Sequence, residues 1–274
     1  MKTILVPTDF SKTSLNAIDY AVEIAIRTKA KIILFHTYYM PIITSDIMVI
    51  PPIDELDNGC SIGLKKIENN IYKKHGKTID VEFKCKYGFP IDEINVFAKE
   101  KKVDLIVMGM QGAGNLTEKI IGSVTTSLIR KSKCPVLAIG EHVKFKPLKK
   151  IVLASDFEEI SNITILKPLK ELANLFKSHI DVLNVVPELE TVPMIRKSVA
   201  GIKLENALDD IKHDFYFSQN ENVVEGINNY ISENDMNMVV TIPRKHSFLK
   251  SVFNEPDTTR IAFHTKVPLL ALHE

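Results

Sequence analysis

The sequence contains one long pattern twice, and this duplication constrains the fold more than any other feature. Residues Ile151 to Phe157 (IVLASDF) repeat Ile4 to Phe10 (ILVPTDF) at an offset of 147. The last part of the chain aligns without a gap at an offset of 133, with Asp104 on Asn237, Val107 on Val240 and Pro135 on Pro268. Two copies of one pattern predict two copies of one domain. We therefore predict domains at 1–143 and 148–274, with a boundary near Gly140 to Pro147.

Within the first copy, apolar runs alternate with helical patterns. The runs predict strands at 2–8, 31–37, 79–86, 105–108 and 135–139. Helices are expected after a cap at Ser11 or Thr13, and then over 55–74, 90–101 and 122–129. In the first helix, apolar residues at helical spacing predict one buried face: Leu15, Ile18, Val22, Ala25 and Ile26. Such alternation predicts an α/β domain, a mostly parallel sheet with helices on both faces.

The loop after the fourth predicted strand is rich in glycine. Gly109, Gly112, Gly122 and Ser123 fit the spacing G-x2-G-x9-G-[ST]. Glycine lets backbone N–H groups approach an anion, and a helix N-terminus offers unpaired donors with a partial positive charge. The pattern therefore favours a phosphate-binding loop. The alternative is that these glycines only turn the chain.

The second copy provides an internal control, because its equivalent positions have lost this pattern. Carried through the offset, the four positions become Ile242, Lys245, Glu255 and Pro256. Glutamate would repel a phosphate and proline removes an N–H donor. We therefore expect the second copy to keep the fold and to lose this way of holding phosphate.

Composition excludes some function classes. The formal net charge is +1 with 25% charged residues, which gives no electrostatic reason to expect nucleic acid or an acidic membrane as a partner. No apolar run is long enough to span a bilayer, and the N-terminus shows no cleavable signal, so a cytoplasmic location is expected. Cys60, Cys85 and Cys134 form no CxxC pair, and we expect free thiols.

The first copy resembles the universal stress protein family over its full length. The resemblance rests on Val6 to Ser11 (VPTDFS), the glycine signature from Gly109 to Ser123, and Lys133 to Leu137 (KCPVL). The second copy resembles the family in outline only. The resemblance implies two tandem Rossmann-like (adenine nucleotide alpha hydrolase-like) domains, each a five-stranded parallel sheet of order 3-2-1-4-5.

The resemblance also implies a site for ATP or a related adenine nucleotide, with Mg²⁺ as an optional companion. Asp9 would lie beside the ribose or adenine, the end of the second strand at His36 and Thr37 would face the adenine, and the signature residues would surround the phosphates. The complete set of candidate residues is Pro7, Thr8, Asp9, Thr37, Gly109, Gly112, Gly122, Ser123 and Val124. The stretch Tyr38 to Asn58 could cover this site or pack on the neighbouring domain. His36 itself is expected to be a hydrogen-bonded structural histidine.

Three functions remain open at this level. The first is a stress-response regulatory protein that binds a nucleotide in its first domain. The second is a slow Mg²⁺-dependent ATPase, although the motif holds no lysine or paired carboxylates for phosphoryl transfer. The third is a ligand-free dimerisation scaffold. The apolar closing strands at 136–139 and 269–272 could pair the two halves as a pseudo-dimer or pair two chains as a homodimer.

Overall fold

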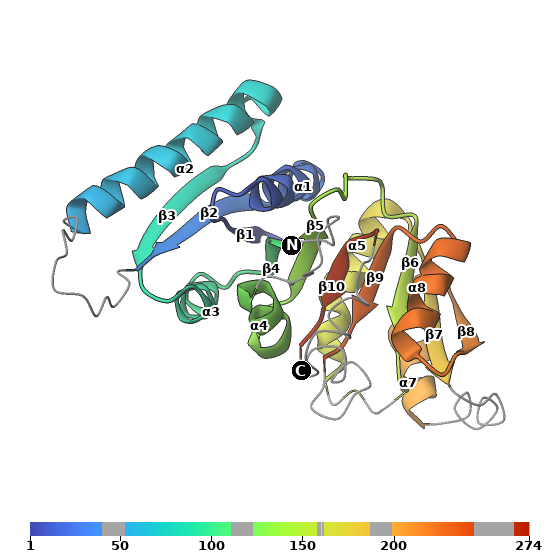
Figure 1. The fold of residues 1–274 in the computed structure, drawn as a ribbon. Coiled ribbons are helices and arrows are strands. Elements are labelled where there is room, and N and C mark those ends of the chain that lie inside the picture. Colours follow the sequence, from blue (N-terminus) through green and yellow to red (C-terminus); the bar gives the residue numbers. More distant parts are fainter. Residues whose placement is uncertain are drawn as a thin grey trace, which may run out of the picture.

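The computed structural model of the chain describes residues 1–39, 53–110, 123–157, 160, 162–186, 199–243 and 266–273. These residues form one continuous ten-stranded sheet with helices packed on it (Figure 1). The strand order is β3-β2-β1-β4-β5-β10-β9-β6-β7-β8. The predicted α/β class is therefore confirmed.

The two halves of the sheet have the same internal order. The first half contains β1 (Thr3–Pro7), β2 (Lys31–Tyr38), β3 (Val81–Tyr87), β4 (Leu105–Met110) and β5 (Val136–Gly140). The second contains β6 (Lys150–Ala154), β7 (His179–Val186), β8 (His213–Gln219), β9 (Met238–Thr241) and β10 (Leu269–Ala271). Counted from its own first strand, each half has the order 3-2-1-4-5, and all of its internal pairs are parallel.

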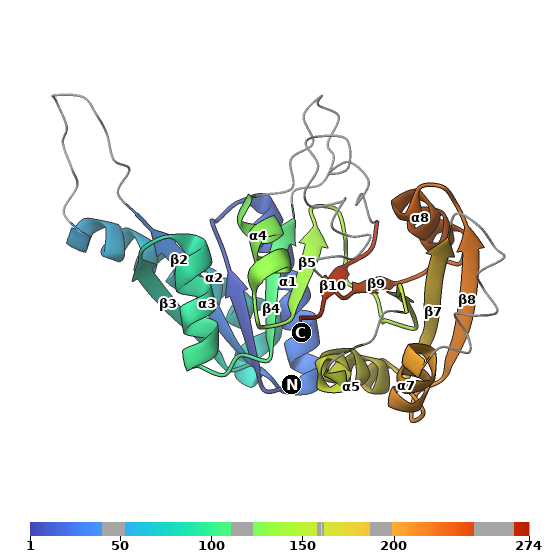
Figure 2. The ribbon, with the colours of Figure 1, turned by 90° about the horizontal axis from the view of Figure 1, so that it is seen from below.

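The halves meet at β5 and β10, which pair antiparallel. Leu269 lies opposite Ala138, and Ala271 lies opposite Val136. Figures 1 and 2 show these two strands side by side at the centre of the molecule. The closing strands therefore pair the two halves of one chain, which is the first of the two pairings that the sequence leaves open. The predicted boundary falls in the connection between β5 and β6, while the domain limits themselves stay a prediction.

The helices divide between the two faces because alternate strand residues point to opposite sides. One core lies under α1 (Lys12–Thr28), α2 (Ile53–His75), α5 (Lys167–Phe176) and α7 (Val199–Ala207). The other lies under α3 (Pro90–Glu100), α4 (Ser123–Lys131) and α8 (Val223–Glu233). Two short 3-10 helices, Gly76–Thr78 and Ile163–Leu166, precede β3 and α5. Among the described residues, no helix has the length and apolar character needed to cross a bilayer.

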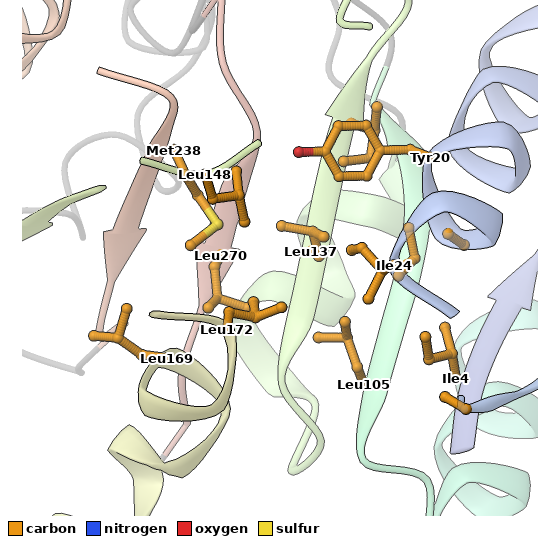
Figure 3. Packing of buried hydrophobic residues seen from close by; sticks show 14 of the residues in the cluster. Ile4, Tyr20, Ile24, Leu105, Leu137, Leu148, Leu169, Leu172, Met238 and Leu270 are labelled. Carbon is orange, nitrogen blue, oxygen red and sulfur yellow. The ribbon is translucent and has the colours of Figure 1, made fainter. Parts of the chain in front are cut away.

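The first of these cores runs across the junction of the two halves. Leu137 on β5, Leu270 on β10 and Leu172 on α5 are completely buried in the same cluster (Figure 3). Leu148, in the connection between the halves, is buried with them. Burial of apolar surface is the main stabilising term in folding, so separating the halves would expose this shared cluster to water.

The predicted buried face of α1 is partly wrong. Ile18, Val22 and Ala25 are buried as expected, whereas Leu15 is 39% exposed and Ile26 is 42% exposed. The buried side of the helix instead includes polar side chains, among them Asn16 and Tyr20. Asn16 is buried because its amide donates to the carbonyl oxygens of Gly140 and Val143, at 3.0 and 2.9 Å. Polar groups that pair with the connection between the halves have replaced part of the apolar stripe.

The expectation of three free thiols is also wrong. Cys60 on α2 and Cys85 on β3 form a disulfide, with their Cα atoms 6.2 Å apart. The two residues are separated by 25 positions in the chain, and only the packing of α2 on β3 brings them together. Cys134 is the free cysteine, and burial raises the pKa of its thiol to about 12. This thiol is therefore protonated and unreactive at neutral pH.

Candidate functional site

A cavity of about 420 Å³ lies at the carboxyl ends of β1, β2 and β4. In open parallel sheets this edge binds ligands where the strand order reverses, and β1 and β4 flank that position here. The strands contribute Pro7, Thr8, Phe35, His36, Thr37, Met108 and Gly109 to its lining. The volume falls within the range of about 300–1,000 Å³ that is typical of small-molecule sites.

The end of β1 forms a tight turn that aims the chain into α1. The hydroxyl of Thr8 is buried, accepts a hydrogen bond from the Phe10 backbone N–H at 3.0 Å, and lies 2.9 Å from the hydroxyl of Ser14. Phe10 has a φ of 65°, which non-glycine residues adopt rarely. Because side-chain hydrogen bonds hold this turn, the next residues reach the cavity in a fixed geometry.

The N-terminus of α1 faces the cavity through Ser11, Thr13 and Ser14. Ser11 is the N-cap, and its hydroxyl accepts from the Ser14 backbone N–H at 3.2 Å. The Asp9 carboxylate accepts from the Ser11 backbone N–H at 3.0 Å. Burial acts to raise the pKa of this carboxyl, but hydrogen bonds from Ser11 and Ser14 outweigh it and hold the pKa below its ordinary value. Asp9 is therefore an ionised acceptor at the mouth of the cavity.

Two further helices begin at the same cavity. The N-terminal part of α3 contributes Pro90 and Ile94, and the first turn of α4 contributes Val124 and Thr125. Each helix N-terminus carries unpaired N–H groups and roughly half a positive charge. Three such termini around one cavity create a site that favours an anion, with no lysine or arginine among the described residues of the lining.

Gly109 has a packing role that is separate from anion binding. A Cβ atom at this position would lie 2.8 Å from the backbone carbonyl of Thr13, closer than real contacts allow. The absence of a side chain therefore lets α1 approach β4. The Gly109 carbonyl accepts a hydrogen bond from the Thr125 hydroxyl at 2.8 Å, which links β4 to the first turn of α4.

The end of β2 is held by His36. Its Nδ1 lies 2.7 Å from the carbonyl oxygen of Thr8, so this nitrogen carries the proton and donates. The ring packs against Phe10 with the centroids 4.6 Å apart. The prediction of a structural, hydrogen-bonded histidine is confirmed. Thr37 follows it in the lining, and Tyr39 stands at the rim with half of its surface exposed.

The cavity is apolar on one side and polar on the other. Phe35, Ile94 and Met108 are buried in the core beneath the cavity and give this side of it an apolar surface. The hydroxyls of Thr8, Ser11, Thr13, Ser14, Thr37 and Thr125 and the Asp9 carboxylate supply polar groups. Such a lining suits a ligand with one flat apolar end and one end rich in hydrogen-bonding oxygens.

Most of the predicted site residues come together here. Pro7, Thr8, Asp9, Thr37, Gly109 and Val124 all line the cavity. Ser123 is the first residue of α4, while Gly112 and Gly122 lie outside the described residues. Sequence reasoning missed Thr13, Ser14, Thr125, Ile94 and Met108. The start of α3 at Pro90 was visible in the sequence, but its position beside β2 and α4 depends on the order of the strands.

Fold and cavity together define a class: a Rossmann-like α/β protein with a ligand cavity at the carboxyl edge of its parallel strands. Residues 1–140, half of the chain, match the Universal stress protein family. Over 143 residues the chain is 36% identical to the Universal stress protein YxiE of Bacillus subtilis. The aligned segment covers 50% of this chain and 97% of that protein. The chain belongs to the universal stress protein family.

Solved structures agree with this fold. A universal stress protein from Archaeoglobus fulgidus superposes with a TM-score of 0.76 over 99% of this chain and 98% of its own, at 16% identity. The match over both halves confirms the tandem arrangement. A universal stress protein solved in complex with cAMP is 28% identical over 50% of this chain and 96% of its own, with a TM-score of 0.40.

Proposed function

We propose that the first half binds ATP or a related adenine nucleotide in the 420 Å³ cavity, and that the protein acts as a regulatory binding protein in a stress response. The observation that carries this proposal is the convergence of three helix N-termini on one cavity that also has an apolar side. A base would lie against Phe35, Ile94 and Met108, and phosphates would lie toward the starts of α1 and α4. Asp9 would accept a hydrogen bond from a ribose hydroxyl.

The proposal also assigns roles to the residues of the glycine signature. Gly112, Gly122 and Ser123 would surround the phosphates, with Gly109 holding α1 in place beside them. Domain limits of 1–143 and 148–274 and a cytoplasmic location belong to the same proposal. In a reducing cytoplasm the Cys60 and Cys85 thiols would be favoured over their disulfide. Binding should therefore be measured in both states.

A binding role is favoured over a catalytic one. Phosphoryl transfer needs metal-binding carboxylates and cationic stabilisation of the transferred group. Among the described residues, the lining of this cavity holds one carboxylate, Asp9, and no lysine or arginine. We expect at most slow hydrolysis, with Mg²⁺ accompanying the nucleotide rather than held by a protein site.

Calorimetric titration of the whole chain with ATP, ADP and cAMP tests the proposal. One equivalent per chain is expected, because Ile242 replaces Gly109 in the second half. Val124→Trp would fill the cavity and abolish binding. Val96→Trp is the matched control, since Val96 lies on α3 with about half of its surface exposed and does not line the cavity.

The outcomes separate the alternatives. Two equivalents per chain would contradict the proposed loss in the second half. Undiminished binding by the Val124→Trp variant would place the nucleotide elsewhere. Multiple-turnover release of phosphate at about 1 s⁻¹ or faster would favour an enzyme.

A further inference from the structure

A second cavity, of about 340 Å³, lies between the two halves and is separate from the nucleotide cavity. Its walls come from Tyr20 on α1, from the connection that follows β5, and from the segments that lead into β9 and β10. None of the described residues that line it also lines the first cavity. It is therefore a distinct space that exists only because the chain joins two copies of the fold.

One wall of this cavity is formed by Tyr20, whose ring is buried. Tyr20 is 2% exposed, and its ring packs edge-on against Phe145 with the centroids 5.1 Å apart. Figure 3 shows its oxygen directed away from α1, toward the strands of the second half. Within the part of the chain that the structure describes, this oxygen makes no hydrogen bond. A phenol hydroxyl that faces a cavity and pairs with no described residue is available to donate a hydrogen bond to a ligand.

Neighbouring polar groups do not share this feature. Asn16, one turn before Tyr20, uses its amide nitrogen on two backbone carbonyls and its oxygen on the Lys144 ammonium, at 3.0 Å. Asn237, across the cavity, accepts from the backbone N–H groups of Lys149 and Lys150 at 2.9 and 3.0 Å. These two amides are paired within the fold, whereas the Tyr20 hydroxyl pairs with no described residue.

The charges around the cavity are mostly positive. Among the described residues that line it, three are lysines (Lys144, Lys146 and Lys266) and one is a histidine, His142, against one carboxylate, Asp235. Lys144 and Lys146 reach the cavity from the connection between the halves, and Lys266 reaches it from the second half. Burial raises the pKa of the Tyr20 hydroxyl, which keeps it protonated and able to donate.

We propose that this cavity is a second ligand site, for a small molecule that carries two or more anionic oxygen groups, either phosphates or carboxylates. The Tyr20 hydroxyl donates a hydrogen bond to one anionic oxygen. Lys146 and Lys266 neutralise the rest of the charge from opposite sides of the junction. Hydrogen bonds to charged groups are stronger than neutral ones, so one buried donor contributes substantially to affinity and to orientation.

The test is calorimetric titration of the whole chain at low ionic strength, with inorganic pyrophosphate and citrate as probes. One equivalent of at least one probe should bind, and the preferred probe separates phosphate from carboxylate recognition. Tyr20→Phe keeps the packed ring and should weaken binding about tenfold. Lys266→Met should weaken it further, and Lys73→Met, an exposed lysine on α2, should leave it unchanged.

Two measurements distinguish the loss of an anion contact from a folding defect and from binding in the first cavity. Because Tyr20→Phe keeps the packed ring and removes a hydroxyl that pairs with no described residue, it should leave the unfolding temperature unchanged while it weakens binding of the anion. Val124→Trp, which fills the nucleotide cavity, should not affect pyrophosphate or citrate. No binding of either probe, equal binding by the Tyr20→Phe variant, or loss of binding in the Val124→Trp variant would each overturn the proposal.

Discussion

The turn after the first strand of each half has the same structure, although the cavity proposed to bind a nucleotide lies beside the first of these turns. In the second half Ser155 takes the place of Thr8, and its hydroxyl accepts from the Phe157 backbone N–H at 3.1 Å. Phe157 has a φ of 53°, against 65° for Phe10. The Asn184 amide donates to the Ser155 carbonyl at 2.8 Å, as His36 does to Thr8 in the first half.

The halves differ in what fills the space around this turn. Phe10 is 36% exposed at the edge of the sheet, whereas Phe157 is 7% exposed and packs on the rings of Phe215 and Phe217. Ile242 replaces Gly109 and is buried in the core. Val185, which replaces Thr37, packs so closely on α8 that a Cβ at Gly226 would lie 2.6 Å from it.

The start of the first helix changes with these side chains. In the first half α1 begins at Lys12, directly after its cap, and Gly109 allows the close approach. In the second half the corresponding helix begins with a 3-10 turn at Ile163, and α5 itself starts at Lys167. The hydrogen-bonded turn therefore belongs to the fold, while the open space and the nearby helix N-terminus belong to the site.

The largest expected effect concerns a cross-link that the second half lacks. The Cys60–Cys85 disulfide joins α2 to β3 in the first half. No cysteine lies after position 134, so α7 and β8 cannot have an equivalent bond. A disulfide stabilises chiefly by restricting the unfolded chain, and a loop of this length is worth about 3 kcal/mol. Reduction, or the double substitution Cys60→Ser with Cys85→Ser, should lower the free energy of unfolding by about that amount.

Denaturant unfolding with and without a thiol reductant measures this effect. The double variant should show no dependence on reductant, and Cys134→Ser, which alters the free cysteine, should keep the full dependence. Thiol titration of the denatured, unreduced protein should count one thiol. A count of three would mean that the bond is absent.

The next effect tests the packing role of Gly109. Gly109→Ala places a Cβ against the backbone of Thr13 and should lower the free energy of unfolding by about 2 kcal/mol through overpacking. It should also weaken nucleotide binding, because the start of α1 must move. Gly59→Ala is the matched control: Gly59 lies on α2, where a Cβ meets nothing within 4 Å.

Alanine is the better helix former, so Gly59→Ala should stabilise by about 0.5–1 kcal/mol. Thermal or denaturant unfolding of both variants gives the comparison directly. Equal stability of the two alanine variants would show that β4 and α1 do not pack as described, and that Gly109 serves only the ligand.

Local patterns in the sequence were enough to predict the duplication and the strands, and six of the predicted site residues line the cavity: Pro7, Thr8, Asp9, Thr37, Gly109 and Val124. Apolar runs identify strands without knowledge of their neighbours, and the capping serine at Ser11 identifies a helix start. What failed depended on contacts between distant elements. Cys60 and Cys85 pair only because α2 packs on β3, and the exposure of Leu15 follows from the contact of α1 with the connection after β5. Gly109 was predicted from its position in a motif, but its contact with Thr13 could be seen only in the packed structure.

The smallest effect concerns how the last strand of each half is held. The end of β5 is tied to α1 by the Asn16 amide, which does not titrate. The segment after β10 is tied to α4 by His273, whose Nε2 donates to the Ile129 carbonyl at 2.6 Å. Burial lowers the pKa of His273, and its backbone hydrogen bonds oppose this only in part. The ring is therefore held neutral between the two halves.

This depressed pKa makes the junction sensitive to acid. The unfolded chain binds a proton more readily than the folded one, so stability rises with pH across this range. The contribution is complete above the ordinary histidine pKa of about 6.5 and is lost as the pH falls through the folded value. Urea unfolding at pH 7.5 and pH 5 should show a smaller loss of stability for His273→Gln, which keeps a donor at that place, than for the unmodified chain. Equal losses in the two proteins would mean that His273 titrates freely, and that α4 is held to the second half by packing alone.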